Sequence, residues 1–425
     1  MDNRNCYGVA VGYGCHTSIS SLHTPNPMEC GHMLGKATMK TIRKEDIWLV
    51  IISTILSLGL LAVPSGFTDS GTPCQAIRTS AIVLEVDNAL VKTIGPVTEG
   101  AQQLMIRINH GHFKGQLEQT TNVLMGKKEL DKFFKPGDQA FVVLDLKDDG
   151  TGIAYANVID HYRTSKTLFL ILVFFISLVL IAGWIGLKAI VSFLFTGILI
   201  LKVLLPSFLW GLNPILIAFG VVTLLTAVII FLVGGLSSKG LTAFLGAFSG
   251  ILVTVLLAMG FTKWFQLNGA ASPFAESLVY SGFGHLDLVS IFIAGIFIAS
   301  SGAVMDLSMD IAAAMYEIRE KQPSITRKEL ILSGFTIGRH AIGTMTTTLL
   351  LAYSGGYTGM LMTFIARGVP FENIINMVYV SSELIHTLVG SFGLVLVAPL
   401  TALAGGMVII PPFHKALLSN SIRPL

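Results

Sequence analysis

The feature that most constrains this chain is a series of long apolar runs in its C-terminal half. Each run is close to the length that a helix needs to cross the hydrocarbon core of a bilayer, about 30 Å. Hydrophobic residues make up 52% of the sequence and charged residues only 12%. So few charges cannot cover a water-soluble surface, so the composition predicts an integral membrane protein in a lipid bilayer. The runs are Leu168–Leu187, Ala189–Leu205, Ile215–Leu236, Leu241–Phe261, Leu288–Met305, Leu332–Tyr353 and Leu388–Ile410.

Two segments near the end of the chain leave the number of crossings open. Gly356–Ala366 is too short to cross as a straight helix, so it is either a re-entrant segment or a continuation of the preceding helix. Phe371–His386 predicts an amphipathic helix near the membrane interface. With the first span, the fold expected is a polytopic α-helical membrane protein with eight or nine spans, and residues 167–412 form its helical domain.

The N-terminal part divides into a leader and a first span. Residues 1–46 show no apolar period, and we interpret them as a disordered leader or a misassigned start, followed by a basic flank. We expect residues 47–63 to be a retained transmembrane helix, because the run is long for a signal peptide and no clear cleavage site follows. The leader contains Cys6, Cys15, His16, His23, Cys30 and His32, but their spacing matches no usual zinc motif. We therefore predict no metal and no other cofactor.

Residues 72–162 differ from the rest of the chain, because apolar residues alternate with polar ones. Strands are predicted at 81–86, 103–108, 140–146 and 153–159, with Gly, Pro and Asp turn signals between them. Short strands at this spacing predict a small β-barrel of the OB or SH3-like kind, inserted after the first span. The charges of residues 64–166 nearly balance, with 11 Lys and Arg against 12 Asp and Glu. No clustered basic face is indicated, so nucleic-acid binding is not expected.

Lys and Arg also predict the orientation of the chain. Loops on the cytoplasmic side of a membrane are enriched in these residues. The predicted topology satisfies this rule when the N-terminus is cytoplasmic, and residues 64–166 are then extracytoplasmic. The residues that fall inside are Arg43, Lys44, Lys239, Arg319, Lys321, Arg327 and Lys328.

Two segments, Ile298–Ala312 and Ile337–Met345, together resemble the YibE/F family of bacterial membrane proteins. The resemblance covers roughly residues 75–410 and takes in Phe113–Gln116, Phe134–Asp138, Ser382-Glu383 and Gly390–Leu394. It implies a multi-pass protein of the bacterial plasma membrane with this layout, but it implies no biochemical activity. The family pattern usually has Asp after Arg339, and this chain has His340. A role that needs a carboxylate at this position is therefore not expected.

Several ionisable residues fall within or near the predicted spans. Holding a charge there costs about 2.5–3.5 kcal/mol on insertion scales, so such residues are candidates for function. Asp306 and Asp310 share one helix face because they are four residues apart. An ion pair from either of them to Arg339 on the next helix is plausible. The full candidate set is Asp306, Asp310, Arg339, His340, Glu383 and His386.

Four interpretations of these residues stay open. The first is a secondary transporter of an unidentified small solute or ion, with Asp310 carrying the coupling charge and Arg339 as its partner. In the second, the carboxylates only pair with Arg339 and fix the packing of the helices. The third is an intramembrane metal-dependent enzyme, which we disfavour because neither HExxH nor GxSxG occurs. The fourth is a scaffold or accessory protein that binds a protein partner through residues 72–162.

A run of threonines, Thr344 and Thr346 to Thr348, follows Arg339 on the same predicted helix. These side chains either line a polar path or hydrogen-bond to their own backbone, as threonines in helices often do.

Overall fold

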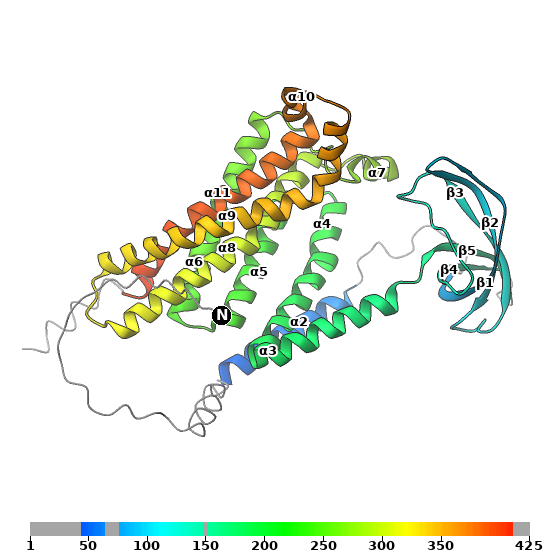
Figure 1. The fold of residues 1–425 in the computed structure, drawn as a ribbon. Coiled ribbons are helices and arrows are strands. Elements are labelled where there is room, and N and C mark those ends of the chain that lie inside the picture. The colour runs from blue at the N-terminus through cyan, green and yellow to red at the C-terminus, as the bar shows by residue number, and fades with distance from the viewer. Residues whose placement is uncertain (1–43, 64–75, 148–151, 411–425) are drawn as a thin grey trace, which may run out of the picture. The chain divides into compact units, whose positions relative to one another are not determined.

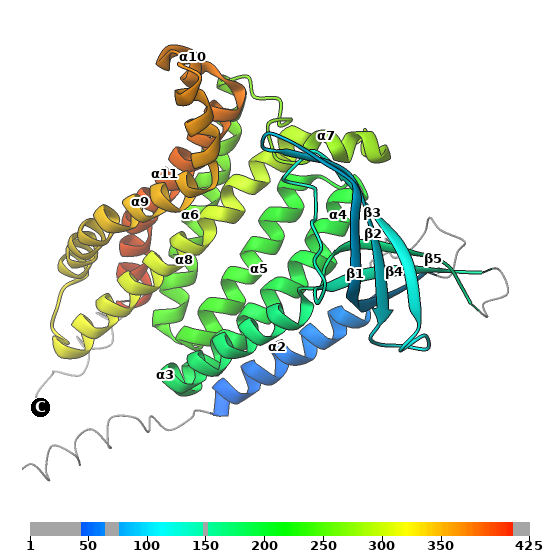
Figure 2. The same ribbon diagram turned by 45° about the vertical axis from the view of Figure 1, so that its right-hand side comes forward.

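The computed structural model describes residues 44–63, 76–147 and 152–410. Within these ranges, a β-sheet lies between residues 76 and 161 and long helices follow from residue 164 (Figures 1 and 2). Helix α2, Lys44–Ala62, covers the first apolar run. The Cys and His residues of the leader lie outside the described ranges.

In residues 76–147 and 152–161 the insert forms five strands that pair in antiparallel fashion in the order β3-β2-β1-β4-β5. The hydroxyl of Thr120 on β3 donates to the carbonyl oxygen of Ala156 on β5 at 2.5 Å. This bond joins the two outer strands, so the sheet is a nearly closed barrel, as the alternating pattern predicts. The strands are β1 Ala76–Ile94, β2 Val97–Ile108, β3 Leu117–Met125, β4 Gln139–Leu146 and β5 Ile153–His161.

Strand β3 is the strand that the alternating pattern does not predict, because two of its buried side chains, Thr120 and Asn122, are polar. Asn122 Nδ2 donates to Oε1 of Gln102 at 3.0 Å. The same Gln102 oxygen accepts the N–H of Phe134 at 3.0 Å, and Gln102 Nε2 donates to the Phe134 carbonyl at 3.1 Å. These hydrogen bonds satisfy the polar side chains inside the barrel, where an apolar alternation is expected.

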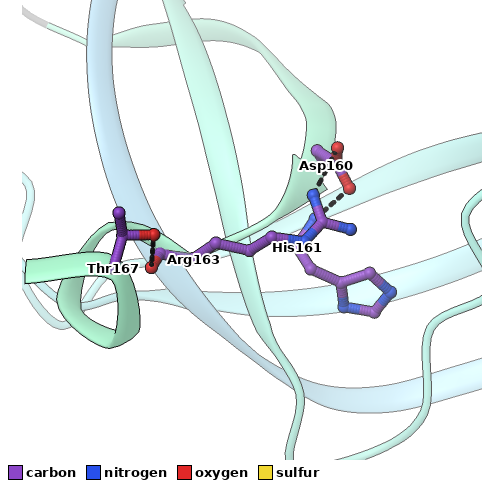
Figure 3. Close-up of polar contacts among 4 residues, drawn as sticks. All are labelled: Asp160, His161, Arg163 and Thr167. Atoms are coloured by element: carbon purple, nitrogen blue, oxygen red, sulfur yellow. Dashed lines mark hydrogen bonds and ion pairs between the residues drawn. The ribbon is translucent and has the colours of Figure 1, made fainter. Parts of the chain in front are cut away.

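Strand β5 passes into helix α3, Thr164–Leu199, through a short polar turn (Figure 3). Arg163 Nη1 donates to Oδ2 of Asp160 at 2.7 Å, and the N–H of His161 donates to Oδ1 of the same carboxylate at 2.6 Å. The hydroxyl of Thr167 donates to the Arg163 carbonyl at 3.1 Å. The hydrogen bond from Arg163 holds the pKa of Asp160 below its ordinary value. The carboxylate is therefore ionised at neutral pH and keeps this turn closed.

Helix α3 reverses direction at Gly183, where φ is 56° and ψ is −127°. In a straight helix Phe174 and Phe193 would lie about 28 Å apart. Their ring centroids are 6.3 Å apart, so the two halves of α3 run antiparallel (Figure 1). A Cβ at Gly186 would collide with the Leu178 carbonyl, which shows how closely the halves approach. The sequence predicts two spans that are separated at residue 188. The structure separates them at Gly183 instead, because glycine adopts a positive φ without strain.

The second half of α3 continues through the π-helical turn η1, Ile200–Leu204, into α4, Leu205–Leu209. Helix α5, Pro214–Gly234, begins after Asn213, whose side chain accepts two backbone N–H groups of the first turn. Helix α6, Ser238–Trp264, begins after Ser237, and α8, Leu288–Lys321, begins after Asp287, each through a side-chain N-cap. Between α6 and α8 lie α7, Ala275–Leu278, and the π-helical turn η2, Val279–Phe283.

Helices α6, α8 and α11, Val378–Val408, pack through small residues. A Cβ at Gly250 of α6 would lie 2.8 Å from the Val397 side chain of α11 and 3.1 Å from that of Val304 on α8. Gly393 of α11 faces Thr254 of α6 in the same way. Small residues let membrane helices approach closely, and the three helices share one apolar core.

Helix α9, Arg327–Ala366, packs against α8 and α11 and is continuous for 40 residues (Figures 1 and 2). Residues 356–366 therefore continue the preceding helix and are not re-entrant. The expected amphipathic helix at Phe371–His386 is wrong. Helix α10, Phe371–Asn376, ends at Met377, whose extended backbone separates it from α11.

Among the residues that the structure describes, six helical segments are long and apolar enough to cross a membrane when Thr164–Leu209 is counted as one. This agrees with the membrane protein that the composition predicts.

Candidate functional site

A cavity of about 410 Å³ lies where the C-terminal end of α9 and the N-terminal end of α11 meet the segment that joins α6 to α8. Tyr357 of α9, Tyr379 and Glu383 of α11, and Glu276 of α7 line it. None of the described lining residues is Lys, Arg or His. With two carboxyl groups and no basic residue in its described lining, the cavity favours cations over anions.

Two residues continue this site one helical turn farther from the ends of α9 and α11. Tyr353 precedes Tyr357 by four residues, and His386 follows Glu383 by three. Residues with this spacing lie on one helix face. The cavity and the Tyr353–His386 pair are therefore consecutive layers along the same two helix faces.

Tyr353 and His386 face each other across the α9–α11 contact. Their ring centroids are 4.9 Å apart with an interplanar angle of 34°. Phe292 of α8 meets the same histidine edge to face, at 6.5 Å and 72°. A Cβ at Gly390 would lie 3.2 Å from Cβ of Ser300 and 3.7 Å from Oη of Tyr353. The three helices thus meet at the tyrosine hydroxyl because Gly390 has no side chain.

Each ring of this pair carries a polar atom that lacks a partner. Tyr353 Oη and His386 Nε2 are buried and form no hydrogen bond with the described residues. A buried polar group without a partner costs about 1–3 kcal/mol. Such groups in a native protein are usually satisfied by water, an ion or a ligand. Eight side-chain atoms are in this state among the described residues, and Tyr353 and His386 are the two whose rings contact each other. The pair is therefore a candidate position for a water, an ion or a polar ligand.

A family model for YibE/F-like proteins matches residues 170–411 of the chain. The chain belongs to the YibE/F family. The match covers more than half of this YibE/F protein and includes α8, α9 and α11. Helix α9 carries Tyr353, and α11 carries Glu383 and His386. The match leaves out residues 75–169, over which we expected the resemblance to extend. No curated protein and no solved structure matches the chain.

The structure brings two of the six predicted residues of this YibE/F protein into the site. Glu383 and His386 are half-buried on α11. Asp306 and Asp310 are exposed on α8, and Arg339 and His340 are exposed on α9. Within the described ranges, no ion pair joins Asp306 or Asp310 to Arg339. The structure thus gives no support to the interpretation that these carboxylates only fix the packing of the helices.

Helical periodicity relates the remaining residues to the site. Arg339, Thr346 and Tyr353 are spaced by seven residues, which is about two turns, so they lie along one face of α9. Asp310 follows Phe292 by about five full turns of α8, so it lies on the face that meets His386. The faces of α8 and α9 that form the site therefore also carry Asp310 and Arg339, which lie nearer the opposite ends of these two helices.

The threonines of α9 divide between the two expected roles. Thr344, Thr347 and Thr348 each donate to a backbone carbonyl of the preceding turn. The Thr346 hydroxyl is buried and unpartnered among the described residues. Thr346 is thus a second unpartnered polar group on the same face as Tyr353. The hydroxyls of the other three threonines are hydrogen-bonded to the backbone of their own helix.

The tyrosines and Glu276 of the site are not predicted from the sequence. Tyr353, Tyr357 and Tyr379 look like ordinary membrane-helix residues when read one at a time. The seven-residue spacing that runs from Arg339 through Thr346 to Tyr353 is the signal that could have found the first of them. For metal binding, no group of three His, Cys, Asp or Glu side chains comes together anywhere in residues 44–63, 76–147 and 152–410.

Proposed function

We propose that this YibE/F protein is a secondary transporter that moves a small solute along the faces of α8, α9 and α11. The observation that carries the proposal is the unpartnered pair of Tyr353 and His386, one turn below an acid-lined cavity. A solute, proton or water that enters through the cavity would supply the missing hydrogen bonds. Unsatisfied polar groups are expensive inside a membrane protein, so a polar solute that bonded to this pair would be favoured there.

The topology that we propose has eight crossings: α2, the two halves of α3 with α4, then α5, α6, α8, α9 and α11. Both chain ends are then cytoplasmic, and the β-sheet is extracytoplasmic in the plasma membrane. The loop between α8 and α9 carries Arg319, Lys321, Arg327 and Lys328 and falls on the cytoplasmic side, as the positive-inside rule requires. The acid-lined cavity then faces the outside.

In this arrangement the predicted charged residues of α8 and α9 lie in the cytoplasmic half of the pathway. Asp310 carries the coupling charge, with Asp306 beside it on the same helix and Arg339 and His340 on α9. Glu383 lies at the outer entrance, and His386 and Tyr353 lie between the two ends. We assign no catalytic role and no cofactor to these residues.

The charge of the outer cavity favours one class of solute. Glu276 and Glu383 line it without a basic neighbour among the described lining residues, so an anion would be repelled. Tyr357 and Tyr379 add aromatic faces, which attract cations. We therefore propose a neutral or cationic solute.

The test is a current measurement on proteoliposomes adsorbed to a solid-supported membrane. Tetraethylammonium, choline, glycine, glucose and benzoate are applied in turn to the wild type and to Tyr353→Phe. Tyr280→Phe is the matched control, since Tyr280 is 86% exposed and lies outside the site. We expect currents from at least one neutral or cationic solute in the wild type and in Tyr280→Phe, and none in Tyr353→Phe. Wild-type currents that match those of empty liposomes for every solute would overturn the proposal.

A second candidate function rests on the β-sheet. Leu90, Ile94, Val123 and Met125 are each at least 60% exposed, and the strand register places them on one face of the sheet. Exposed apolar clusters on a domain often mark protein interaction sites. A scaffold role predicts a specific crosslinked partner in native membranes that is lost in the full-length Leu90→Lys/Ile94→Lys variant. If the same partner is recovered from wild type and variant, this face is not its binding site.

A further inference from the structure

We infer that the outer cavity binds an organic ammonium ion, whose positive charge is held by aromatic rings and carboxyl groups. The cavity has a volume of about 410 Å³, and three aromatic side chains and two carboxyl groups line it. They belong to Phe274, Tyr357, Tyr379, Glu276 and Glu383. The inference rests on the proposed function, because it narrows the class of solute for the same cavity.

The five side chains reach the cavity from three separate parts of the chain. Phe274 and Glu276 belong to the segment between α6 and α8, and Tyr357 lies on α9. Tyr379 and Glu383 are four residues apart on α11, so they share one helix face. The two carboxyl groups therefore come from different elements, and aromatic rings lie on all three.

This combination of walls matches the chemistry of an ammonium ion that carries carbon groups. The face of an aromatic ring attracts a cation that lies within about 6 Å of the ring centre, and aromatic cages recognise quaternary ammonium groups in this way. A carboxyl group adds the attraction of opposite charges, and a bound cation in turn favours the ionised form of that group. The carbon groups of the ion can pack against the rings and against Met360, which also lines the cavity.

Other classes of ligand use these walls less well. Calcium takes about six to eight oxygen ligands, and magnesium takes about six. No group of three His, Cys, Asp or Glu side chains that could hold a metal occurs in the part of the chain that the structure describes. An uncharged solute gains neither the attraction of the carboxyl groups nor that of the ring faces for a cation. An organic ammonium ion uses both.

The conformation of Phe274 gives an independent indication of a ligand. Within the described ranges, Gln266 and Phe274 are the two residues other than glycine that have a positive φ, and both lie between α6 and α8. Phe274 has a φ of 63°, and its side chain is 80% exposed at the cavity. Residues held in this unfavourable conformation concentrate at ligand-binding and active sites. A ligand that packed against the ring would remove its exposure.

The segment that carries Phe274 is held in place by its own backbone and by α8. A Cβ at Gly269 would collide with the carbonyl of Leu288 at the start of α8, so the two segments are in close contact. The N–H of Ala275 donates to the Ser272 carbonyl at 3.1 Å, and Ala275 is buried. This wall of the cavity is therefore formed before a ligand arrives, which lowers the entropic cost of binding.

The aromatic residues of the cavity differ from those of an ordinary membrane interface. Trp and Tyr are common where a helix leaves the hydrocarbon core. Trp264 and Tyr280 are 75% and 86% exposed, and neither lines the cavity, so both fit that role. Tyr357 is half-buried and lines the cavity together with two carboxyl groups. Its position is therefore better explained by a bound cation than by contact with lipid.

The test is isothermal titration calorimetry of the purified full-length protein in detergent, with two probes of the same shape. Choline carries a trimethylammonium group, and neohexyl alcohol has carbon in place of the nitrogen and no charge. Choline should bind at least about tenfold more tightly, because only choline offers a charge to the rings and carboxyl groups. Equal affinities for the two probes, or no binding of choline, would overturn the inference.

Two substitutions at exposed positions of the cavity locate the site, and both variants should fold. Glu276→Gln and Tyr379→Leu should each weaken choline binding at least about threefold and leave the affinity for neohexyl alcohol nearly unchanged. Glu372→Gln and Tyr280→Leu are the matched controls, since both residues are exposed and lie outside the cavity. These controls should bind choline like the wild type. Unchanged choline binding in both cavity variants would also overturn the inference.

Binding and transport can fail separately in these experiments. Choline binding that depends on Glu276 and Tyr379, without any current in proteoliposomes, would support the ammonium site and contradict transport. Currents from glucose or glycine in a protein that does not bind choline would support transport and contradict the ammonium site.

Discussion

The ring of Tyr353 on α9 lies 4.9 Å from the ring of His386 on α11, and each ring buries a polar atom that has no partner among the described residues. Glu383, one turn away on α11, lines the outer cavity. Thr346, two turns away on α9, carries a third unpartnered polar atom. This succession of polar groups through tightly packed helices is the basis of the proposed pathway.

Replacing Tyr353 separates stability from transport. In Tyr353→Phe the unpartnered hydroxyl is gone and the ring contact with His386 stays. We expect the free energy of unfolding to be unchanged or to rise by about 1 kcal/mol, since an unsatisfied buried group is costly, while flux is lost. Thermal unfolding in detergent and flux in proteoliposomes, with Tyr280→Phe as control, check this. A destabilised variant that still transports would show that the hydroxyl is structural.

Asp310 is predicted to matter for flux and not for folding. It is exposed and forms no described ion pair, so Asp310→Asn should express and unfold like the wild type. Flux should fall at least about tenfold, since the amide cannot carry the coupling charge. Glu320→Gln, at an exposed position farther along α8, is the control and should change neither quantity. Misfolding of Asp310→Asn would instead favour a structural role in holding the helices together.

Close helix packing makes Gly393 intolerant of a side chain. A Cβ there would collide with Thr254 of α6. Gly393→Ala should lower the free energy of unfolding by about 1–3 kcal/mol, the usual cost of overpacking. Gly260→Ala, with nothing within 4 Å of its Cβ, should change it little. Adding Thr254→Ala to Gly393→Ala should restore part of the loss, and no restoration would mean that the collision is not its cause.

The N-cap of α8 predicts a pH dependence. Asp287 accepts the N–H groups of Val289 and Ser290 at 3.1 Å and the Ser290 hydroxyl at 2.5 Å. These bonds, the hydroxyl above all, hold its pKa below the ordinary 3.8. Because the folded pKa is the lower one, the ionised cap stabilises the protein above the unfolded pKa, and this contribution is lost as the pH falls through the folded pKa.

We therefore expect Asp287→Ala to lose about 1 kcal/mol at pH 7, with a smaller loss at acid pH. Unfolding curves at several pH values between 3 and 7 (roughly the range over which the two pKa values act) measure this. Asp287→Asn keeps an acceptor and should lose less than the alanine variant at neutral pH. A pH-independent difference between wild type and Asp287→Asn would contradict a role for the charge.

Removing the hydrogen bonds of the Gln102 side chain should loosen the β-sheet near Phe134. Its side chain is fully buried and hydrogen-bonds both backbone groups of Phe134. Gln102→Leu leaves the Phe134 N–H unpaired, at a cost of about 1–3 kcal/mol. Hydrogen exchange of the Phe134 amide in the full-length protein should become faster. Gln103→Leu, whose side chain only accepts from the Thr121 hydroxyl, should leave it unchanged. Equal Phe134 exchange in both variants would contradict the anchoring role.

Hydrophobic length and period predict most of the fold, because they report directly on burial in lipid or in a core. They fail where another interaction replaces burial. Strand β3 is missed since Thr120 and Asn122 face inward with hydrogen bonds. The reversal in α3 is misplaced because its position depends on the φ of Gly183, which an apolar run does not reveal.

The candidate site is harder to predict than the fold. Glu383 and His386 stand out because charge is rare in membrane helices, and the structure places both at the site. Tyr353 becomes notable only when it meets His386 on another helix, and a sequence pattern does not specify that contact. The unpaired state of Asp306 and Asp310 likewise depends on how α8 and α9 are turned.

The central claim, a polar pathway along one face of α9, is tested most directly by cysteine accessibility. The variants are made in a full-length chain whose four native cysteines, Cys6, Cys15, Cys30 and Cys74, are replaced by serine. Thr346→Cys lies on the face shared with Tyr353, and Leu351→Cys lies on another side of the same helix. A water-soluble methanethiosulfonate reagent is applied to protein in proteoliposomes. A pathway predicts modification of Thr346→Cys and protection of Leu351→Cys, because water reaches only the first. Protection of Thr346→Cys would contradict the claim and leave a sealed helix contact in its place.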